Sequence, residues 1–73
     1  MNITPNQCRA ARAFLRWTRN DLAARAKVLP RTIVDFENGH RETKHTTIVT
    51  LRVTFEEAGL RFTERGGVEP GES

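Results

Sequence analysis

Residues 18–39, TRNDLAARAKVLPRTIVDFENG, predict two short helices joined by a tight turn. Thr18 and Asp21 have the spacing of an N-terminal capping box, in which each side chain bonds the backbone N–H of the other residue. A helix is therefore expected over Arg19–Ala26. Its apolar residues are mostly small, which allows a neighbouring helix to approach closely.

The second helix of this stretch is expected over Pro30–Glu37. Proline suits the first turn of a helix, because its missing N–H would have no partner there. Ile33 and Phe36, spaced i and i+3, face inward, and Asn38-Gly39 favours the left-handed C-terminal cap that ends a helix. A helix of about eight residues is not stable alone in water, so it must pack against other elements.

Apolar residues at helical spacing predict further helices on either side of this pair, over Pro5–Arg16 and from Thr46 or Thr47 to Ala58. Leu60–Thr63 alternates apolar and polar residues and predicts a short strand. We expect an all-α fold, a four-helix bundle with one short C-terminal strand. The domain would span residues 1–64, followed by a flexible tail over 65–73.

The chain has 73 residues and a net charge of +3, and the charges are unevenly distributed. Up to Thr54 the net charge is +6, whereas from Phe55 onward it is −3. The positive charge therefore belongs to the helical part, where an anionic partner such as nucleic acid could use it. A basic surface that only keeps the protein soluble is the simpler alternative.

A single cysteine, Cys8, excludes a disulfide scaffold, and we expect it to be a small core residue. Apolar runs are short, so no signal peptide or membrane span is expected and the predicted location is the cytoplasm, at the nucleoid. Trp17 is expected in the core, because a chain that binds single strands would expose several aromatic residues. Glu37 and His40 are separated by a helix break, so no metal site or other cofactor is expected.

Two short helices joined by a three-residue turn form a helix-turn-helix, whose second helix can enter the DNA major groove. The longer stretch CRAARAFLRWTRNDLAARAKVLPRTIVDFENGH, Cys8–His40, resembles the Cro and lambda-repressor type of bacterial and phage regulator, the XRE family. The resemblance extends to about Phe62. It implies a lambda-repressor-like fold and a sequence-specific transcription regulator or repressor that binds double-stranded DNA.

The resemblance also implies roles for individual residues. The positions that match base-reading residues on the second helix are Arg31, Thr32, Val34 and Asp35. The positions that match phosphate contacts are Arg19, Asn38, His40, Arg41 and Lys44. Arg12 and Glu37 match a partly buried ion pair that ties the first helix to the end of the third.

Some of these roles have alternatives. Arg31 suits the two acceptors of guanine. Asp35 could accept a hydrogen bond from cytosine, or it could orient Arg31 across one helical turn and repel phosphates at wrong registers. Thr32 could contact a thymine methyl group or a phosphate, and Leu29, at the turn, a thymine methyl group.

Three residues depart from the usual family pattern. Lys27 and Arg16 stand where glycine is common, and Lys27 should cost about 1 kcal/mol or less if the turn stays left-handed. Leu29 replaces a capping Ser or Thr at a cost of about 1 kcal/mol. An alternative to a tight DNA-binding regulator is therefore a family member that has kept the fold but has lost tight, sequence-specific DNA binding.

The predicted strand needs a partner, and a second copy of the chain would provide one. Leu60 and Phe62 would then be buried together in a two-fold homodimer on an inverted-repeat operator. A protein-interaction module of the antitoxin or anti-activator type is the second hypothesis, with helix 46–58 and the tail as its surface and Val49 and Val53 as its apolar residues. An enzyme is the weakest hypothesis, because no nucleophile-base pair or carboxylate pair is evident.

Overall fold

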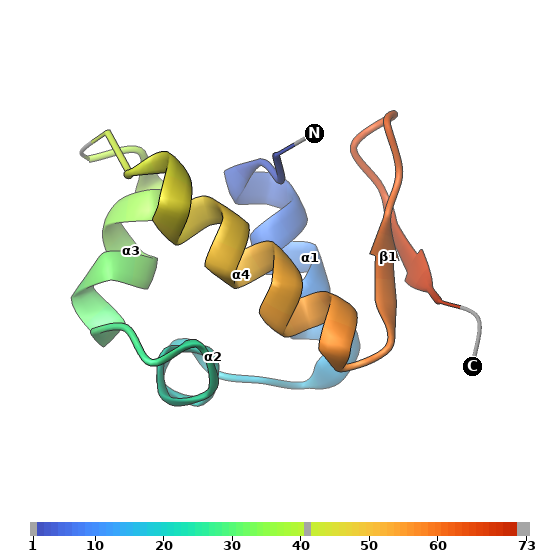
Figure 1. Cartoon of the computed structure of the whole chain (residues 1–73), viewed down its shortest axis with the longest axis horizontal. Coiled ribbons are helices and arrows are strands. Elements are labelled where there is room, and N and C mark those ends of the chain that lie inside the picture. Colours follow the sequence, from blue (N-terminus) through green and yellow to red (C-terminus); the bar gives the residue numbers. More distant parts are fainter. Residues whose placement is uncertain (1, 41, 72–73) are drawn as a thin grey trace.

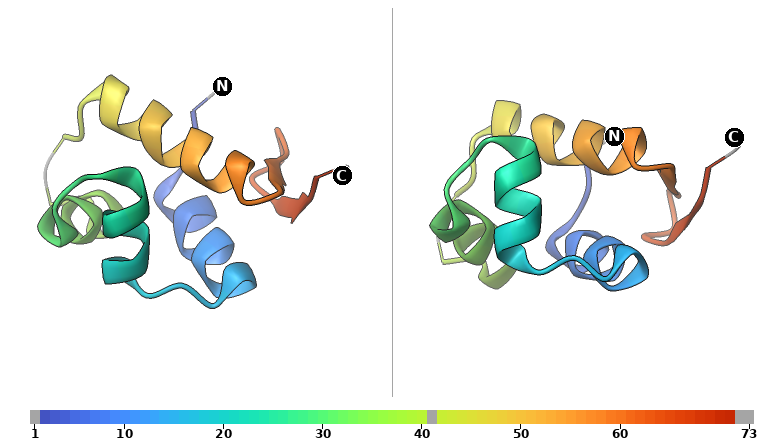
Figure 2. Two further views of the ribbon diagram at one scale, coloured as in Figure 1. Left: turned by 60° about the horizontal axis from the view of Figure 1, so that its bottom comes forward. Right: turned by 90° about the horizontal axis from the view of Figure 1, so that it is seen from below.

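The computed structural model describes residues 2–40 and 42–71, which form four helices and a two-stranded antiparallel sheet. The elements in chain order are α1 (Pro5–Leu15), α2 (Arg19–Ala26), α3 (Pro30–Asn38), α4 (His45–Glu57), β1 (Leu60–Phe62) and β2 (Val68–Pro70). Figures 1 and 2 place α3 at one end of the molecule and the sheet at the other, with α4 running between them. None of the described helices is long and apolar enough to cross a membrane.

The predicted helices are confirmed, with small shifts at their ends. α1 ends at Leu15 because Arg16 adopts the left-handed conformation, with φ 57°. Lys27 ends α2 in the same conformation, with φ 59°, so the left-handed turn is retained although this residue is not glycine. α4 begins at His45, slightly earlier than expected, with Lys44 as its N-cap residue.

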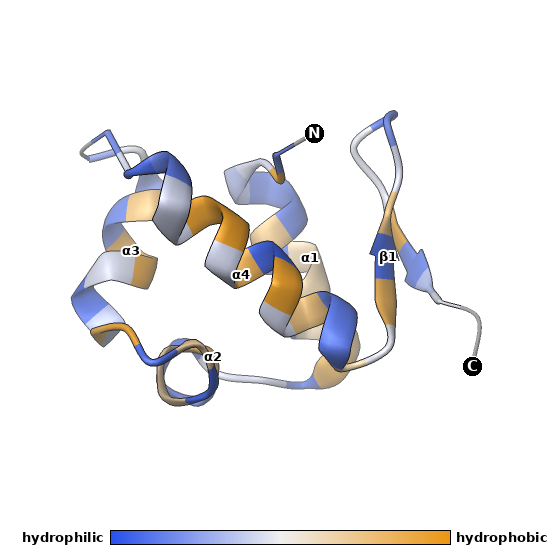
Figure 3. Ribbon diagram, in the orientation of Figure 1, coloured by the Kyte–Doolittle hydropathy of each residue, from blue (hydrophilic) through white to orange (hydrophobic). Residues whose placement is uncertain are grey.

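The core is assembled from all four helices and the sheet. Its fully buried residues include Leu22, Ile33, Leu51 and Phe55. The Trp17 ring, partly buried as expected, stacks on Phe55 with centroids 5.8 Å apart. Apolar residues recur along every helix (Figure 3), so each helix contributes one face to a shared core.

The C-terminal segment differs from the prediction. Val68–Pro70 is not part of a flexible tail but forms β2, which pairs with β1 in the register Leu60 with Pro70 and Phe62 with Val68. The composition Glu-Pro-Gly suggested fraying, but the positive φ of Gly66 allows the chain to turn back on β1. Residues 72–73 of the expected tail lie outside the described part of the chain.

The expected dimer interface is corrected by the same pairing. Leu60 and Phe62 are already buried within the chain, at 4% and 8% exposed. Phe62 contacts Phe55 edge to face, with centroids 5.9 Å apart. β1 therefore has its strand partner in β2, and burial of these two side chains does not require a second copy.

Gln7 fastens the hairpin to the start of α1. Its side chain is almost fully buried, and its Nε2 donates to the carbonyl oxygens of Thr63 and Gly67, each at 3.2 Å. Its Oε1 accepts from the backbone N–H of Thr4 at 2.9 Å, and the Thr4 hydroxyl completes a capping box. One side chain thus joins the two ends of the described chain.

We expect Gln7→Ala to destabilise the fold by roughly 2–3 kcal/mol, because it removes three hydrogen bonds and an almost fully buried side chain. Urea denaturation followed by circular dichroism measures this. Glu64→Ala, in the exposed hairpin turn, is the control and should shift stability by less than about 0.5 kcal/mol. Equal stability of the two variants would contradict the role given to Gln7.

Candidate nucleic-acid interface

The helix pair α2 and α3 holds one side of α3 against the protein and leaves the other outside. α3 packs against α2 and α1, with Ile33 and Phe36 buried. On the opposite side, the Arg31 side chain is 77% exposed. Thr32 and Asp35 complete what we call the outer flank of α3: Arg31, Thr32 and Asp35. Val34, also expected to read bases, is half-buried beside this flank.

Arg31 and Asp35 form an ion pair across one turn of α3. The Arg31 Nε lies 3.3 Å from Asp35 Oδ1, while the Asp35 side chain is only 14% exposed. His40 Nδ1 lies 3.8 Å from the same oxygen. The carboxylate is therefore largely covered and already paired with Arg31. The bond engages Nε and not the two terminal nitrogens of Arg31.

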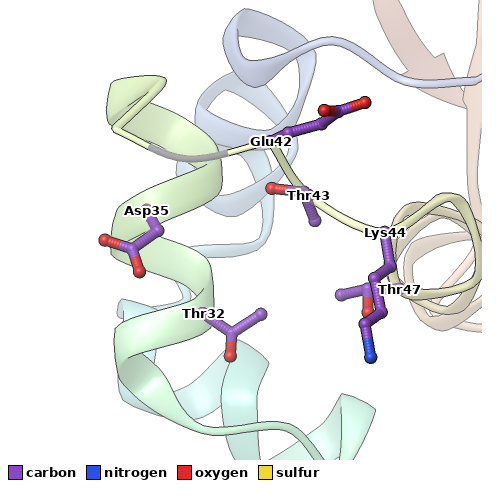
Figure 4. Close-up of a pocket in the computed structure, with 6 residues that line it drawn as sticks. All are labelled: Thr32, Asp35, Glu42, Thr43, Lys44 and Thr47. Atoms are coloured by element: carbon purple, nitrogen blue, oxygen red, sulfur yellow. The ribbon is translucent and has the colours of Figure 1, made fainter.

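A shallow open groove of about 330 Å³ runs beside the outer flank of α3. Figure 4 shows α3 as one wall and the segment entering α4 as the other. The groove is lined by Thr32, Asp35, Glu42, Thr43, Lys44 and Thr47. Lys44 is exposed and supplies its positive charge, and three threonine hydroxyl groups add donors and acceptors. The carboxylates of Asp35 and Glu42 outnumber this one positive charge, so the lining suits a polar partner more than an apolar ligand but does not by itself favour an anion.

The carboxylate of Glu37 occupies the centre of a buried cluster, which we call the Glu37 cluster: Glu37 with Arg12, Arg19 and Cys8. The Glu37 side chain is fully buried. Arg12 donates to both carboxylate oxygens, from Nε at 2.7 Å and from Nη2 at 2.9 Å. The ion pair that the resemblance implied is thus present, and it joins α1 to α3.

Two further members of the Glu37 cluster were not foreseen. Arg19 Nε donates to Glu37 Oε1 at 3.0 Å, and the Cys8 thiol donates to Oε2 at 3.2 Å. Arg19 was expected to contact phosphate, and it also pairs with Glu37. Because its side chain is still 41% exposed, a phosphate contact remains compatible with this ion pair. The sequence pattern predicted that Arg19 lies at the start of α2. It could not predict that the end of α3 lies beside Arg19.

Electrostatics in the Glu37 cluster favour the ionised carboxylate. Burial alone would raise the pKa of Glu37, but hydrogen bonds from Arg12, Cys8 and Arg19 outweigh burial and hold this pKa below its ordinary value. Burial and the adjacent carboxylate raise the pKa of the Cys8 thiol, so it stays protonated and donates. The hydrogen bond to Glu37 raises the pKa of Arg12.

The remaining candidate residues are spread around α3. Asn38 and His40 are exposed at its C-terminal end, Lys44 lies across the groove, and Arg19 lies at the start of α2. Arg41 lies outside the described residues. Among the described residues, no group of three or more His, Cys, Asp or Glu side chains is arranged to hold a metal ion.

We expect Glu37→Gln to destabilise the protein by about 3 kcal/mol at neutral pH, because two arginines lose their buried counter-charge. A carboxyl group with a lowered pKa contributes stability above its unfolded pKa of about 4.3 and loses it as the pH falls through the folded value. The difference between wild type and variant should therefore shrink below about pH 4. Urea denaturation across this pH range measures it.

Glu64→Gln makes the same chemical change in the exposed hairpin turn and is the control. It should track the wild type at every pH. A stability difference for Glu37→Gln that stays constant from neutral to acid pH would contradict the electrostatic role given to Glu37.

The chain thus presents an exposed arginine on a short helix, a polar groove with a lysine opposite, and a buried charge cluster behind them. In comparisons with known proteins, no family model and no curated protein matches this chain. A function for it is therefore argued from its own residues.

Proposed function

We propose that this protein is a sequence-specific DNA-binding regulator that inserts α3 into the major groove. The observation that carries the proposal is the outer flank of α3, where an exposed guanidinium is held by a largely covered carboxylate on a helix packed from behind. The major groove admits one α-helix. This role needs no catalytic group or cofactor, and it places the protein at the bacterial nucleoid.

The ion pair of Arg31 suits it to read guanine. With Nε engaged by Asp35, the two terminal nitrogens form a fork that matches the O6 and N7 acceptors of guanine. A freely rotating arginine would lose more side-chain entropy on binding than one already held. Asp35 would also repel phosphates in wrong registers. The ion pair would therefore contribute to specificity both by orienting Arg31 and by this repulsion.

Phosphate contacts would surround this reading helix. Lys44 faces α3 across the groove, Asn38 and His40 are exposed at the end of α3, and the outer edge of Arg19 is accessible beside α2. Such contacts fix the register on DNA without selecting a sequence, and they make affinity fall with salt.

We also propose that two copies bind an inverted repeat, with half-sites about 34 Å apart. The molecule is 32 Å long, and α3 lies at the opposite end from the hairpin. If two copies met in line through their hairpins, their α3 helices would lie farther apart than one DNA turn. A hairpin contact would therefore require the two copies to be inclined to each other.

A protein-interaction module is the second candidate, and exposed apolar side chains favour it. Val53 on α4 is 40% exposed and Phe14 on α1 is 53% exposed, while Val49 is half-buried. In this case α4 would contact a protein partner and the chain would bind DNA weakly or not at all.

One experiment separates the two candidates. A duplex selected from a random pool is compared with a scrambled duplex at two salt concentrations. Arg31→Ala should reduce the preference for the selected duplex about tenfold, the loss of one bidentate base contact. Lys44→Ala should weaken binding to both duplexes alike and reduce the salt slope by about one.

Arg65→Ala is the matched control, since it removes one positive charge from the hairpin turn, far from α3. It should leave the preference and the salt slope nearly unchanged. Wild-type protein that selects no sequence and shows no salt-dependent binding would favour the interaction module.

Asp35→Asn tests how Asp35 acts. If it orients Arg31, the variant should bind scrambled DNA more tightly, because a negative charge is lost, and its preference for the selected guanine should fall several-fold. If Asp35 instead reads cytosine, the variant should change the preferred base at another position, with adenine favoured by the new amide. Repeating the selection with the variant distinguishes these outcomes.

A further inference from the structure

The apolar side chain of Leu29 has no structural role in the fold. It is 71% exposed, more than Phe14 or Val53, the other large apolar residues that the described chain exposes. It also occupies the N-cap position of α3, where its isobutyl group cannot accept a hydrogen bond from the first turn of the helix. The residue therefore contributes neither to the core nor to the cap.

The local backbone fixes the outward direction of Leu29. Val28 packs against the core, and Leu29 is extended, with ψ 144°, so that neighbouring side chains point to opposite sides. Pro30 then restricts the chain to the start of α3, and the N–H of Thr32 donates to the Leu29 carbonyl at 2.9 Å. The side chain is thus held at the end of α3 that carries Arg31.

The chemistry of the major groove narrows what could contact this group. The N-terminal residues of a recognition helix lie closest to the base edges. Those edges present hydrogen-bond donors and acceptors, and their one apolar group is the methyl group of thymine. An isobutyl group placed against the polar edge of guanine or cytosine would remove water from that edge and give no hydrogen bond in return.

We propose that Leu29 determines specificity by contacting the 5-methyl group of a thymine beside the guanine read by Arg31. The inference rests on the proposed function, because it requires α3 to lie in the major groove. In this case Leu29 contacts a base, whereas a residue such as serine at the same position would cap α3. Stability and specificity should consequently change in opposite directions when this residue is replaced by one that can cap the helix.

The experiment replaces each thymine of the selected duplex, one at a time, by deoxyuridine, which lacks only the methyl group. Wild-type affinity should fall about fourfold at one of these positions, the effect of one methyl group removed from an apolar contact. Leu29→Ala should bind the thymine and deoxyuridine duplexes equally at this position. Phe14→Ala, an exposed apolar residue on α1, is the control and should keep the wild-type sensitivity.

Leu29→Ser adds a second measurement that does not depend on DNA. The new hydroxyl can cap α3, so its urea midpoint should rise above that of wild type while the sensitivity to deoxyuridine disappears. Loss of deoxyuridine sensitivity together with loss of folding in both Leu29 variants would overturn the inference, because the residue would then be structural.

Other outcomes overturn the inference while leaving DNA reading intact. These are a selected site without thymine, equal wild-type affinity for all deoxyuridine duplexes, or Leu29→Ala that keeps the wild-type sensitivity. By contrast, wild-type protein that selects no duplex at all would overturn the proposed function itself, and with it the thymine contact given to Leu29.

Discussion

The arrangement of the helices depends on one buried carboxylate. Glu37 lies near the end of α3, yet its charge is balanced by Arg12 from α1 and Arg19 from α2. A carboxylate without these partners would be costly to bury, so the three helices can close around it only when all of them are in place. A single side chain thereby fixes the position of α3 relative to both neighbours.

This constraint explains how α3 can do without a capping side chain at its start. Leu29 cannot bond the free N–H groups there, and a helix of nine residues gains little stability from its own backbone. Burial of Ile33 and Phe36 and the charge on Glu37 supply the stability instead. These residues all lie on the inner side of α3. The residues of the outer flank are therefore not needed to stabilise the helix and can contact a partner.

Local patterns predicted most of the helical fold. Caps at Thr18 and Gly39 and the i, i+3 spacing of Ile33 and Phe36 act within one or two turns, and the structure contains all of them. The hairpin was missed because β2 is a weak strand by composition, and its pairing depends on β1 and on the distant Gln7. The contacts of Arg19 and Cys8 with Glu37 were missed for the same reason, since they join residues 18 and 29 positions apart in the chain.

The hydrogen bonds of Gln7 to the hairpin also constrain when the protein can finish folding. They connect residues 56 and 60 positions apart, so the turn of the hairpin must exist before the buried amide of α1 has its partners. On a ribosome, the N-terminal helices would be synthesised first. The side of these helices that packs on the hairpin would remain exposed until β1 and β2 emerge. Docking of the hairpin on α1, more than formation of the helices, is then the step expected to limit the folding rate.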